Sequence, residues 1–166
     1  MTSFRSIRFR NLPPYTYVPG VTPHPISDVL GHMYDQPEDL HAGWGLSDWM
    51  RWGQILFDGG CYWEAHEAWE HLWIELGRRG HDADSVKGLI KLAACGVKVL
   101  ESNQTGAIRH AKRAVELLSV GVGEKLYGFE LVVALRIAEA FVSNPDVRPT
   151  LTTGQPAPIP GFALNT

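Results

Sequence analysis

Residues 63–73 read Trp-Glu-Ala-His-Glu-Ala-Trp-Glu-His-Leu-Trp. At about 100° of rotation per residue, the glutamates and histidines of this stretch fall within one arc of about 160° around a helix. Its alanines, Leu72 and Trp69 lie on the opposite side. Such a separation of polar from apolar residues is typical of an amphipathic α-helix that buries its apolar face. The stretch therefore predicts a helical protein whose chemistry is displayed along one helix edge.

On both sides of this stretch the chain has further segments with helical periodicity. We expect helices over residues 47–58, 61–77, 82–101, 106–120 and 126–142. The expected N-caps are Ser47, Asp82 or Asp84, and Thr105, and the expected final stop is Asn144-Pro145. The 82–101 segment is apolar on two faces, which is typical of a central helix. Because no strand-like alternation occurs, we expect an all-α, single-domain bundle of about five helices in antiparallel pairs.

Proline and glycine are dense toward both ends of the chain. Residues 1–46 are expected to form a long irregular arm, because their prolines and glycines exclude regular helix. The arm also carries apolar residues, so we expect it to pack on the body. Residues 47–144 form the expected helical domain, and the Pro-rich residues 145–166 form an extended tail.

The composition limits the classes of partner. With 166 residues, of which 45% are hydrophobic, the chain can bury one sizeable core. The formal net charge of −3 and the lack of a long basic run argue against a nucleic-acid partner. No stretch has the length of a signal peptide's apolar core or of a membrane span, so we expect a cytoplasmic protein with no membrane partner. Cys61 and Cys95 lack a paired ligand spacing, and no disulfide scaffold is expected.

Within the 63–73 stretch, His66 and Glu70 lie four residues apart and share a helix face. This is the spacing of the His-Glu-x-x-His helix of metallohydrolases, with the second imidazole replaced by a carboxylate. In such helices the outer two residues hold a divalent ion, and the intervening glutamate, here Glu67, is the general base. One imidazole and one carboxylate suit zinc, manganese or iron. We therefore predict His66 and Glu70 as metal ligands and Glu67 as the catalytic residue.

Two ligands on one helix do not complete a metal site, so further ligands have to come from elsewhere. The arm supplies His24 and His32, and either one completes a three-ligand site if the arm crosses the helix. The same residues fit an alternative, in which the His/Glu cluster anchors the arm through hydrogen bonds. Trp63 lies near the polar side of the helix and is expected to wall a pocket or an interface.

Two functions from different classes follow from these residues. The first is a helical metal-binding protein and, in its sharper form, a metal-dependent hydrolase that acts on an unidentified small molecule. The second is a non-catalytic structural or interaction module in which the cluster holds the arm in place. Both leave open whether the chain forms a homo-oligomer.

Three runs of the sequence carry a resemblance to a known family. They are residues 57–73, Phe-Asp-Gly-Gly-Cys-Tyr-Trp-Glu-Ala-His-Glu-Ala-Trp-Glu-His-Leu-Trp, residues 87–93, Lys-Gly-Leu-Ile-Lys-Leu-Ala, and Gly106-Ala107. They resemble the small bacterial helical proteins of domain of unknown function family 309, which are commonly labelled predicted metal-dependent hydrolases. The arm, with Pro23-His24-Pro25 and Gly31-His32, resembles the N-terminal extension of one branch of that family. The resemblance implies an all-helical fold and a candidate site at His66, Glu67 and Glu70, and it supplies no substrate.

Overall fold

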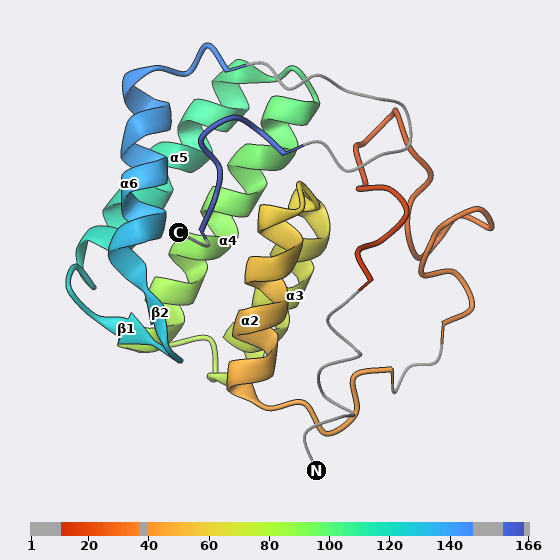
Figure 1. The fold of residues 1–166 in the computed structure, drawn as a ribbon, viewed down its shortest axis with the longest axis horizontal. Helices are drawn as coiled ribbons and strands as arrows, with labels where there is room; N and C mark the ends of the chain where they lie inside the picture. The colour runs from red at the N-terminus through yellow and green to blue at the C-terminus, as the bar shows by residue number, and fades with distance from the viewer. Residues whose placement is uncertain (1–10, 37–39, 148–157, 165–166) are drawn as a thin grey trace.

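A computed structural model describes residues 11–36, 40–147 and 158–164 of the chain. Within these ranges the elements are α2 (Leu46–Asp58), α3 (Tyr62–Glu75), α4 (His81–Leu100), α5 (Gln104–Ser119), β1 (Lys125–Leu126), β2 (Phe129–Glu130) and α6 (Leu131–Ser143). Each helix packs against the next one along the chain, and α6 also contacts α4 (Figure 1). The expected all-α bundle of paired helices is confirmed.

Helix α4 is the centre of the bundle, as its two apolar faces predict. It contacts α3, α5 and α6. Two of its glycines allow this close packing, because a Cβ at Gly96 would lie 2.5 Å from the ring of Tyr62 on α3. A Cβ at Gly88 would likewise lie 2.7 Å from Leu118 on α5. Helix α4 therefore provides the fixed surface against which α3 is held.

The region between α5 and α6 differs from the sequence prediction. The expectations of no strand and of a helix beginning near residue 126 are wrong, because β1 and β2 form a short antiparallel hairpin. Its turn residues Tyr127 and Gly128 both have positive φ, 49° and 84°. Two successive residues of positive φ are typical of the tight turns that join antiparallel strands. Leu126 and Phe129 are buried beside this turn, so α6 begins only at Leu131.

The expected N-caps are also wrong by a few residues. Gly45, Gly80 and Asn103 stand at the N-cap positions of α2, α4 and α5. Asn103 is the one of these whose side chain caps its helix, through Oδ1, which accepts a hydrogen bond from the backbone N–H of Gly106 at 2.9 Å. The acidic and hydroxyl residues chosen from the sequence lie just inside these helices, where they also suit the positive end of the helix dipole.

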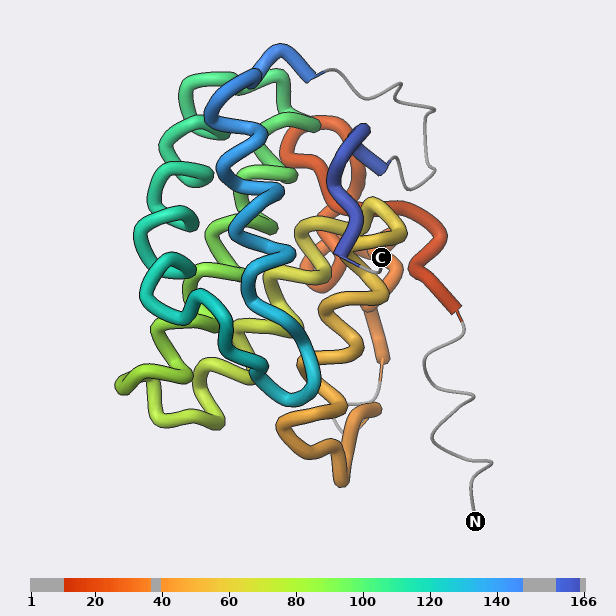
Figure 2. Tube along the Cα trace, turned by 60° about the vertical axis from the view of Figure 1, so that its left-hand side comes forward, coloured from red at the N-terminus to blue at the C-terminus, as the bar shows by residue number. Residues whose placement is uncertain are grey.

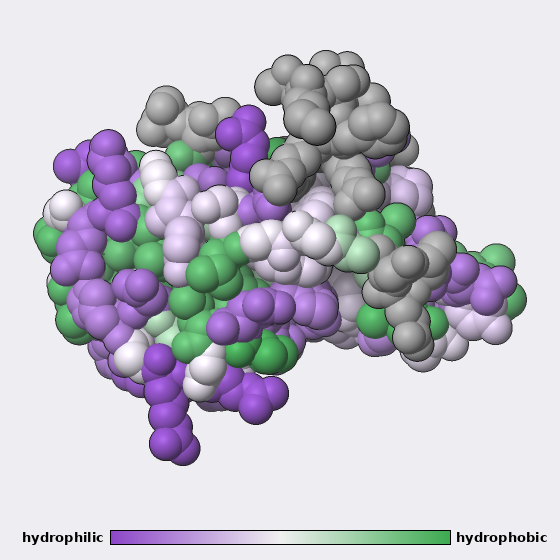
Figure 3. All heavy atoms as spheres, turned by 90° about the horizontal axis from the view of Figure 1, so that it is seen from below, coloured by the Kyte–Doolittle hydropathy of each residue, from purple (hydrophilic) through white to green (hydrophobic). Residues whose placement is uncertain are grey.

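The described part of the arm, residues 11–36 and 40–45, consists of turns and bends and lies beside α2 and α3 (Figures 1 and 2). Thr16 and Val18 are buried against the body. The arm also exposes several large apolar side chains, namely those of Leu12, Val21, Ile26, Val29, Leu30, Tyr34 and Leu40. Hydrophobic residues accordingly reach the surface at the right-hand end of Figure 3. The arm has too little core of its own, so its position depends on contacts with α2 and α3.

At the other end of the chain, residues 158–164 return to the helical body (Figure 2). The ring of Phe162 stacks on Phe57 of α2 at 5.8 Å and also contacts Phe141 of α6. The backbone N–H of Ile159 donates to the hydroxyl of Tyr62 at 2.7 Å. The described end of the tail therefore packs against α2, α3 and α6.

Both cysteines are free and buried within the helical body. Burial raises the pKa of the Cys95 thiol to about 12, and burial together with the charge of Glu64 raises the pKa of Cys61 still further. A thiol held in its protonated form is a poor nucleophile and a poor metal ligand. None of the described helices is both long and apolar enough to cross a membrane.

Candidate metal centre

The candidate site lies on α3, which begins directly after a tight turn that reverses the direction of the chain. Gly60, with φ of 82°, turns the chain back after α2. The apolar face of α3 is then buried between α2 and α4, with Ala65, Trp69 and Leu72 fully inaccessible. Because that face is fixed in the core, the polar arc of the same helix has to face away from it.

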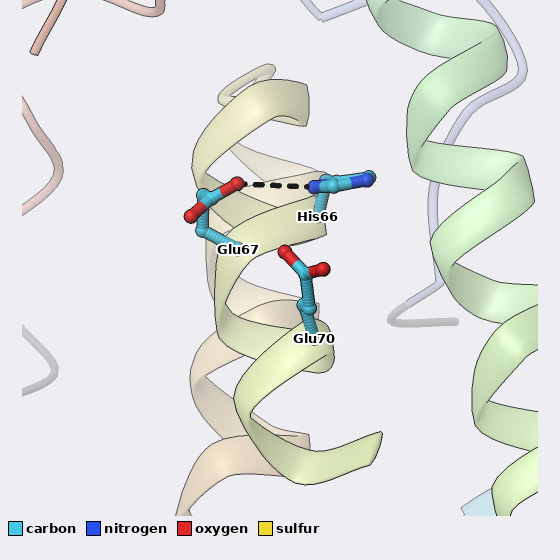
Figure 4. Close-up of side chains that lie close together, drawn as sticks. All are labelled: His66, Glu67 and Glu70. Carbon is cyan, nitrogen blue, oxygen red and sulfur yellow. Dashed lines mark hydrogen bonds and ion pairs between the residues drawn. The ribbon is translucent and has the colours of Figure 1, made fainter. Parts of the chain in front are cut away.

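Three side chains of this arc lie together: His66, Glu67 and Glu70 (Figure 4). Each offers one nitrogen or oxygen atom, and these atoms lie within 4.8 Å of one another. His66 Nδ1 donates to Glu67 Oε1 at 3.3 Å, and the two side chains are 30% and 38% exposed. An imidazole and two carboxylates at this separation form a group that could hold a divalent metal ion.

Neither of the arm histidines joins this group of three. His32 Nε2 donates instead to Glu64 Oε1 at 2.9 Å, with both side chains almost fully buried. His24 Nδ1 accepts hydrogen bonds from the backbone N–H groups of Ile26 and Ser27 and so fixes a turn of the arm. The arm does reach α3, but it meets the edge of the polar arc that carries Glu64.

Glu64 is the residue whose role the sequence prediction missed. Its carboxylate accepts hydrogen bonds from the Thr16 hydroxyl at 2.8 Å, from the Tyr17 backbone N–H at 3.0 Å and from His32. A buried carboxylate with three donors is well satisfied and ties the arm firmly to α3. One signal was available, because Glu64 stands at the edge of the polar arc, beside the apolar face.

A pocket of about 880 Å³ lies between the arm and the helices α2 and α3. Of the group of three, Glu67 lines this pocket, whereas His66 and Glu70 do not. His71 also lines it, and its ring stacks on Trp49 with 4.5 Å between centroids. Trp63 forms part of the wall, as expected from its place near the polar side. Glu67 therefore stands between the candidate metal ligands and the pocket.

The candidate site lies in a part of the chain that matches a protein-family model. Residues 50–110 match the model of the family described as Domain of unknown function (DUF309). This matched stretch, residues 50–110, is called the DUF309 domain below. The match runs from α2 into α5 and includes the whole His/Glu cluster, which confirms the resemblance seen in the sequence. No curated protein matches the chain.

The arm lies outside the DUF309 domain. The candidate metal group and the pocket therefore differ in whether they need the arm. His66, Glu67 and Glu70 all come from the domain itself. The pocket and the bonds to Glu64 are made jointly by the domain and the arm. The candidate metal group is thus a property of the domain, and the enclosure next to it is a property of this longer chain.

On its other side, the group in the DUF309 domain faces cationic residues of α4 and α5. Burial chiefly lowers the pKa of His110, and the nearby charges of Lys91, Lys98 and Arg109, and then His66, lower it further. The neutral form of the His110 imidazole is therefore favoured. Lys91, Lys98 and Arg109 thus bring positive charge near His110, and His110 itself lies near His66.

Proposed function

We propose that the protein binds a divalent metal ion through His66 and Glu70 and acts as a metal-dependent hydrolase on a small molecule. The observation that carries the proposal is the position of Glu67, which belongs to the group of three and also lines the pocket. A side chain in that position can contact both a metal ion held by His66 and Glu70 and a substrate bound in the pocket. The pocket volume of about 880 Å³ is within the range of small-molecule sites.

The donor set fits such an ion. The imidazole nitrogen of His66 and a carboxylate oxygen of Glu70 are ligands that zinc, manganese and iron all accept. Bonds of about 2.0–2.2 Å place the ligand atoms of one ion within about 4.4 Å of one another. The atoms of His66, Glu67 and Glu70 lie within 4.8 Å before any ion is bound, and their half-buried side chains have room to close that difference. When bound, such an ion supplies a Lewis acid that polarises a carbonyl or phosphoryl oxygen.

The protein's own residues have separate tasks in this proposal. Glu67 is the proton acceptor on the pocket side, within hydrogen-bond distance of His66. The tryptophan walls position the substrate and exclude water from it. The net charge of −3 favours a small-molecule substrate over a nucleic acid, and we place the protein in the cytoplasm.

A second candidate is the non-catalytic module, and the bonds to Glu64 favour it. They supply the anchoring of the arm that this candidate requires. However, the anchoring uses Glu64 and leaves His66 and Glu70 without a partner on the arm among the described contacts. The two candidates therefore differ in what they expect of His66 and Glu70.

The test measures metal content and affinity. Protein purified without chelator is analysed for metals, and zinc and manganese are titrated into chelator-treated protein by calorimetry. We expect one equivalent of metal, and affinity about tenfold or more weaker in His66→Ala and Glu70→Gln. His71→Ala, an imidazole removed from the same helix outside the group, is the matched control and keeps wild-type affinity.

Glu67→Gln then tests the hydrolase part in a screen of ester, amide and phosphoester substrates. We expect retained metal binding and activity lower by a factor of about one hundred or more. Absence of stoichiometric metal, or equal losses in His66→Ala and His71→Ala, would reject the metal site in favour of the non-catalytic module. Thermal unfolding in chelator shows that each variant is folded.

A further inference from the structure

The pocket between the arm and α2–α3 has walls that indicate the chemical class of its ligand. Four of the six tryptophans line it: Trp44, Trp49, Trp52 and Trp63. Trp44 packs against Trp49 and Trp52 with ring centroids 5.0 Å and 6.2 Å apart. Trp63 is held from the other side by Tyr17 at 5.3 Å. Rings that pack against one another in this way are positioned before a ligand arrives.

Indole rings favour two kinds of ligand group. Their large apolar faces pack against flat or branched apolar groups, and their π-electrons attract cations. Several aromatic rings around one volume are the usual means by which proteins bind quaternary ammonium groups. The tryptophan walls alone leave open whether the ligand is neutral or positively charged.

The charges around the pocket favour a positively charged ligand over a neutral one. Its lining, within the part of the chain that the structure describes, contains two carboxylates, Glu64 and Glu67, and three histidines, His32, His41 and His71, but neither lysine nor arginine. The carboxylate oxygens of Glu64 are already engaged by three hydrogen-bond donors, as described above. Glu67 has its one hydrogen bond with His66, and its side chain is 38% exposed. Among the described lining residues, an anionic ligand would therefore meet the carboxylate of Glu67 with no lysine or arginine beside it, whereas a cation would be attracted.

We propose that this pocket binds a small organic cation with an aromatic or apolar body, held between the tryptophan rings with its cationic centre toward Glu67. The cation proposal rests on the proposed function in one respect, namely that the bound cation is the substrate of the hydrolase. Binding itself needs the pocket and Glu67 and no metal ion. The two proposals can therefore fail separately, because metal content is measured without the cation and the cation is titrated in chelator.

The experiment compares three probes that share a phenyl ring: benzyltrimethylammonium, benzyl alcohol and phenylacetate. Each is titrated into the full chain in chelator at pH 7.5, and the indole N–H signals of all tryptophans are followed by two-dimensional NMR. We expect benzyltrimethylammonium to bind about tenfold or more tightly than phenylacetate, with benzyl alcohol between them. The signals of the pocket tryptophans should move, whereas those of Trp69 and Trp73, which do not line the pocket, should stay.

Two variants of α3 show whether Glu67 is responsible. Glu67→Gln keeps the shape of the side chain and removes its charge, so we expect about fivefold weaker binding of the cation. Glu75→Gln removes the same charge from an exposed position on the same helix and should leave binding unchanged. The proposal is overturned if phenylacetate binds as tightly as the cation, if Trp69 and Trp73 respond most strongly, or if the two variants behave alike.

Discussion

The two edges of the polar arc on α3 carry similar residues and have different surroundings. At one edge, Glu64 is buried beneath the arm and accepts three hydrogen bonds from it. At the other edge, His66 and Glu70 are half-buried, and the contacts that define their group come from α3 alone. Glu64 and His66 are two positions apart in the sequence. The comparison teaches that the role of a polar residue in this motif depends on what covers it.

The helix geometry explains why one arm cannot serve both edges. Glu64 and His66 are separated by about 160° around the helix axis, so a segment that packs on one of them faces away from the other. Glu67 lies between them and lines the pocket. The polar arc is therefore divided into an anchor, a pocket wall and a candidate metal group, in that order around the helix.

The largest expected effect on stability comes from breaking the anchor. Glu64→Gln keeps the size of the side chain, but the amide group cannot accept hydrogen bonds at both of its terminal atoms. We expect a loss of about 3 kcal/mol in the free energy of unfolding, because buried donors on the arm lose a charged acceptor. Chemical denaturation followed by circular dichroism measures it.

The matched control for the anchor is Glu67→Gln, the same substitution one helical turn further along. Its side chain is 38% exposed, and its hydrogen bond with His66 is long, at 3.3 Å. We expect a change within about 0.5 kcal/mol. Equal losses in the two variants would contradict the division of the arc.

A smaller effect should follow from removing one donor of the anchor. Thr16→Val replaces the buried hydroxyl that donates to Glu64 Oε2 at 2.8 Å with a methyl group of similar size. We expect a loss of about 2 kcal/mol, since hydrogen bonds to charged groups contribute more than neutral ones. Thermal and chemical unfolding should agree. A neutral result would mean that the arm is held by its apolar contacts alone.

The smallest effect is expected at an exposed His–Glu pair, which contrasts with the buried pair His32–Glu64. His81 Nε2 lies 2.5 Å from Glu124 Oε2. This hydrogen bond, and then the charge of Glu124, raise the pKa of His81 above its ordinary value of 6.5. Because the folded state binds the proton more tightly, the pair stabilises the fold fully below about pH 6.5, and this stabilisation is lost as the pH rises through the raised pKa.

The pH dependence of the melting temperature tests this pair. The difference between wild type and His81→Gln should be greatest near pH 5.5 and disappear at about pH 9, and at its greatest it should be smaller than the effect of Thr16→Val. The variant His110→Gln serves as a contrast, because the pKa of His110 is lowered and the difference from wild type should therefore change with pH in the opposite direction. A difference that is the same at every pH would show that the charge of His81 contributes nothing.

Local patterns predicted much of the fold and a defined part of the site. The 3.6-residue periodicity was enough for five helices and for the central place of α4, since it reflects which faces must be buried. The hairpin before α6 was missed because its turn requires a positive φ at Tyr127. Positive φ is uncommon for a tyrosine, so nothing in the sequence indicated this turn. The group of His66, Glu67 and Glu70 was found because all three residues share one helix.

The sequence by itself determined which residues of α3 face away from the core, because the rotation per residue is fixed by the backbone. It could not determine which of them the arm would cover. That was decided by tertiary structure, through the register in which Thr16, Tyr17 and His32 meet Glu64. The physical reason is that a long irregular segment has no periodicity of its own, and its position depends on contacts between residues far apart in the chain.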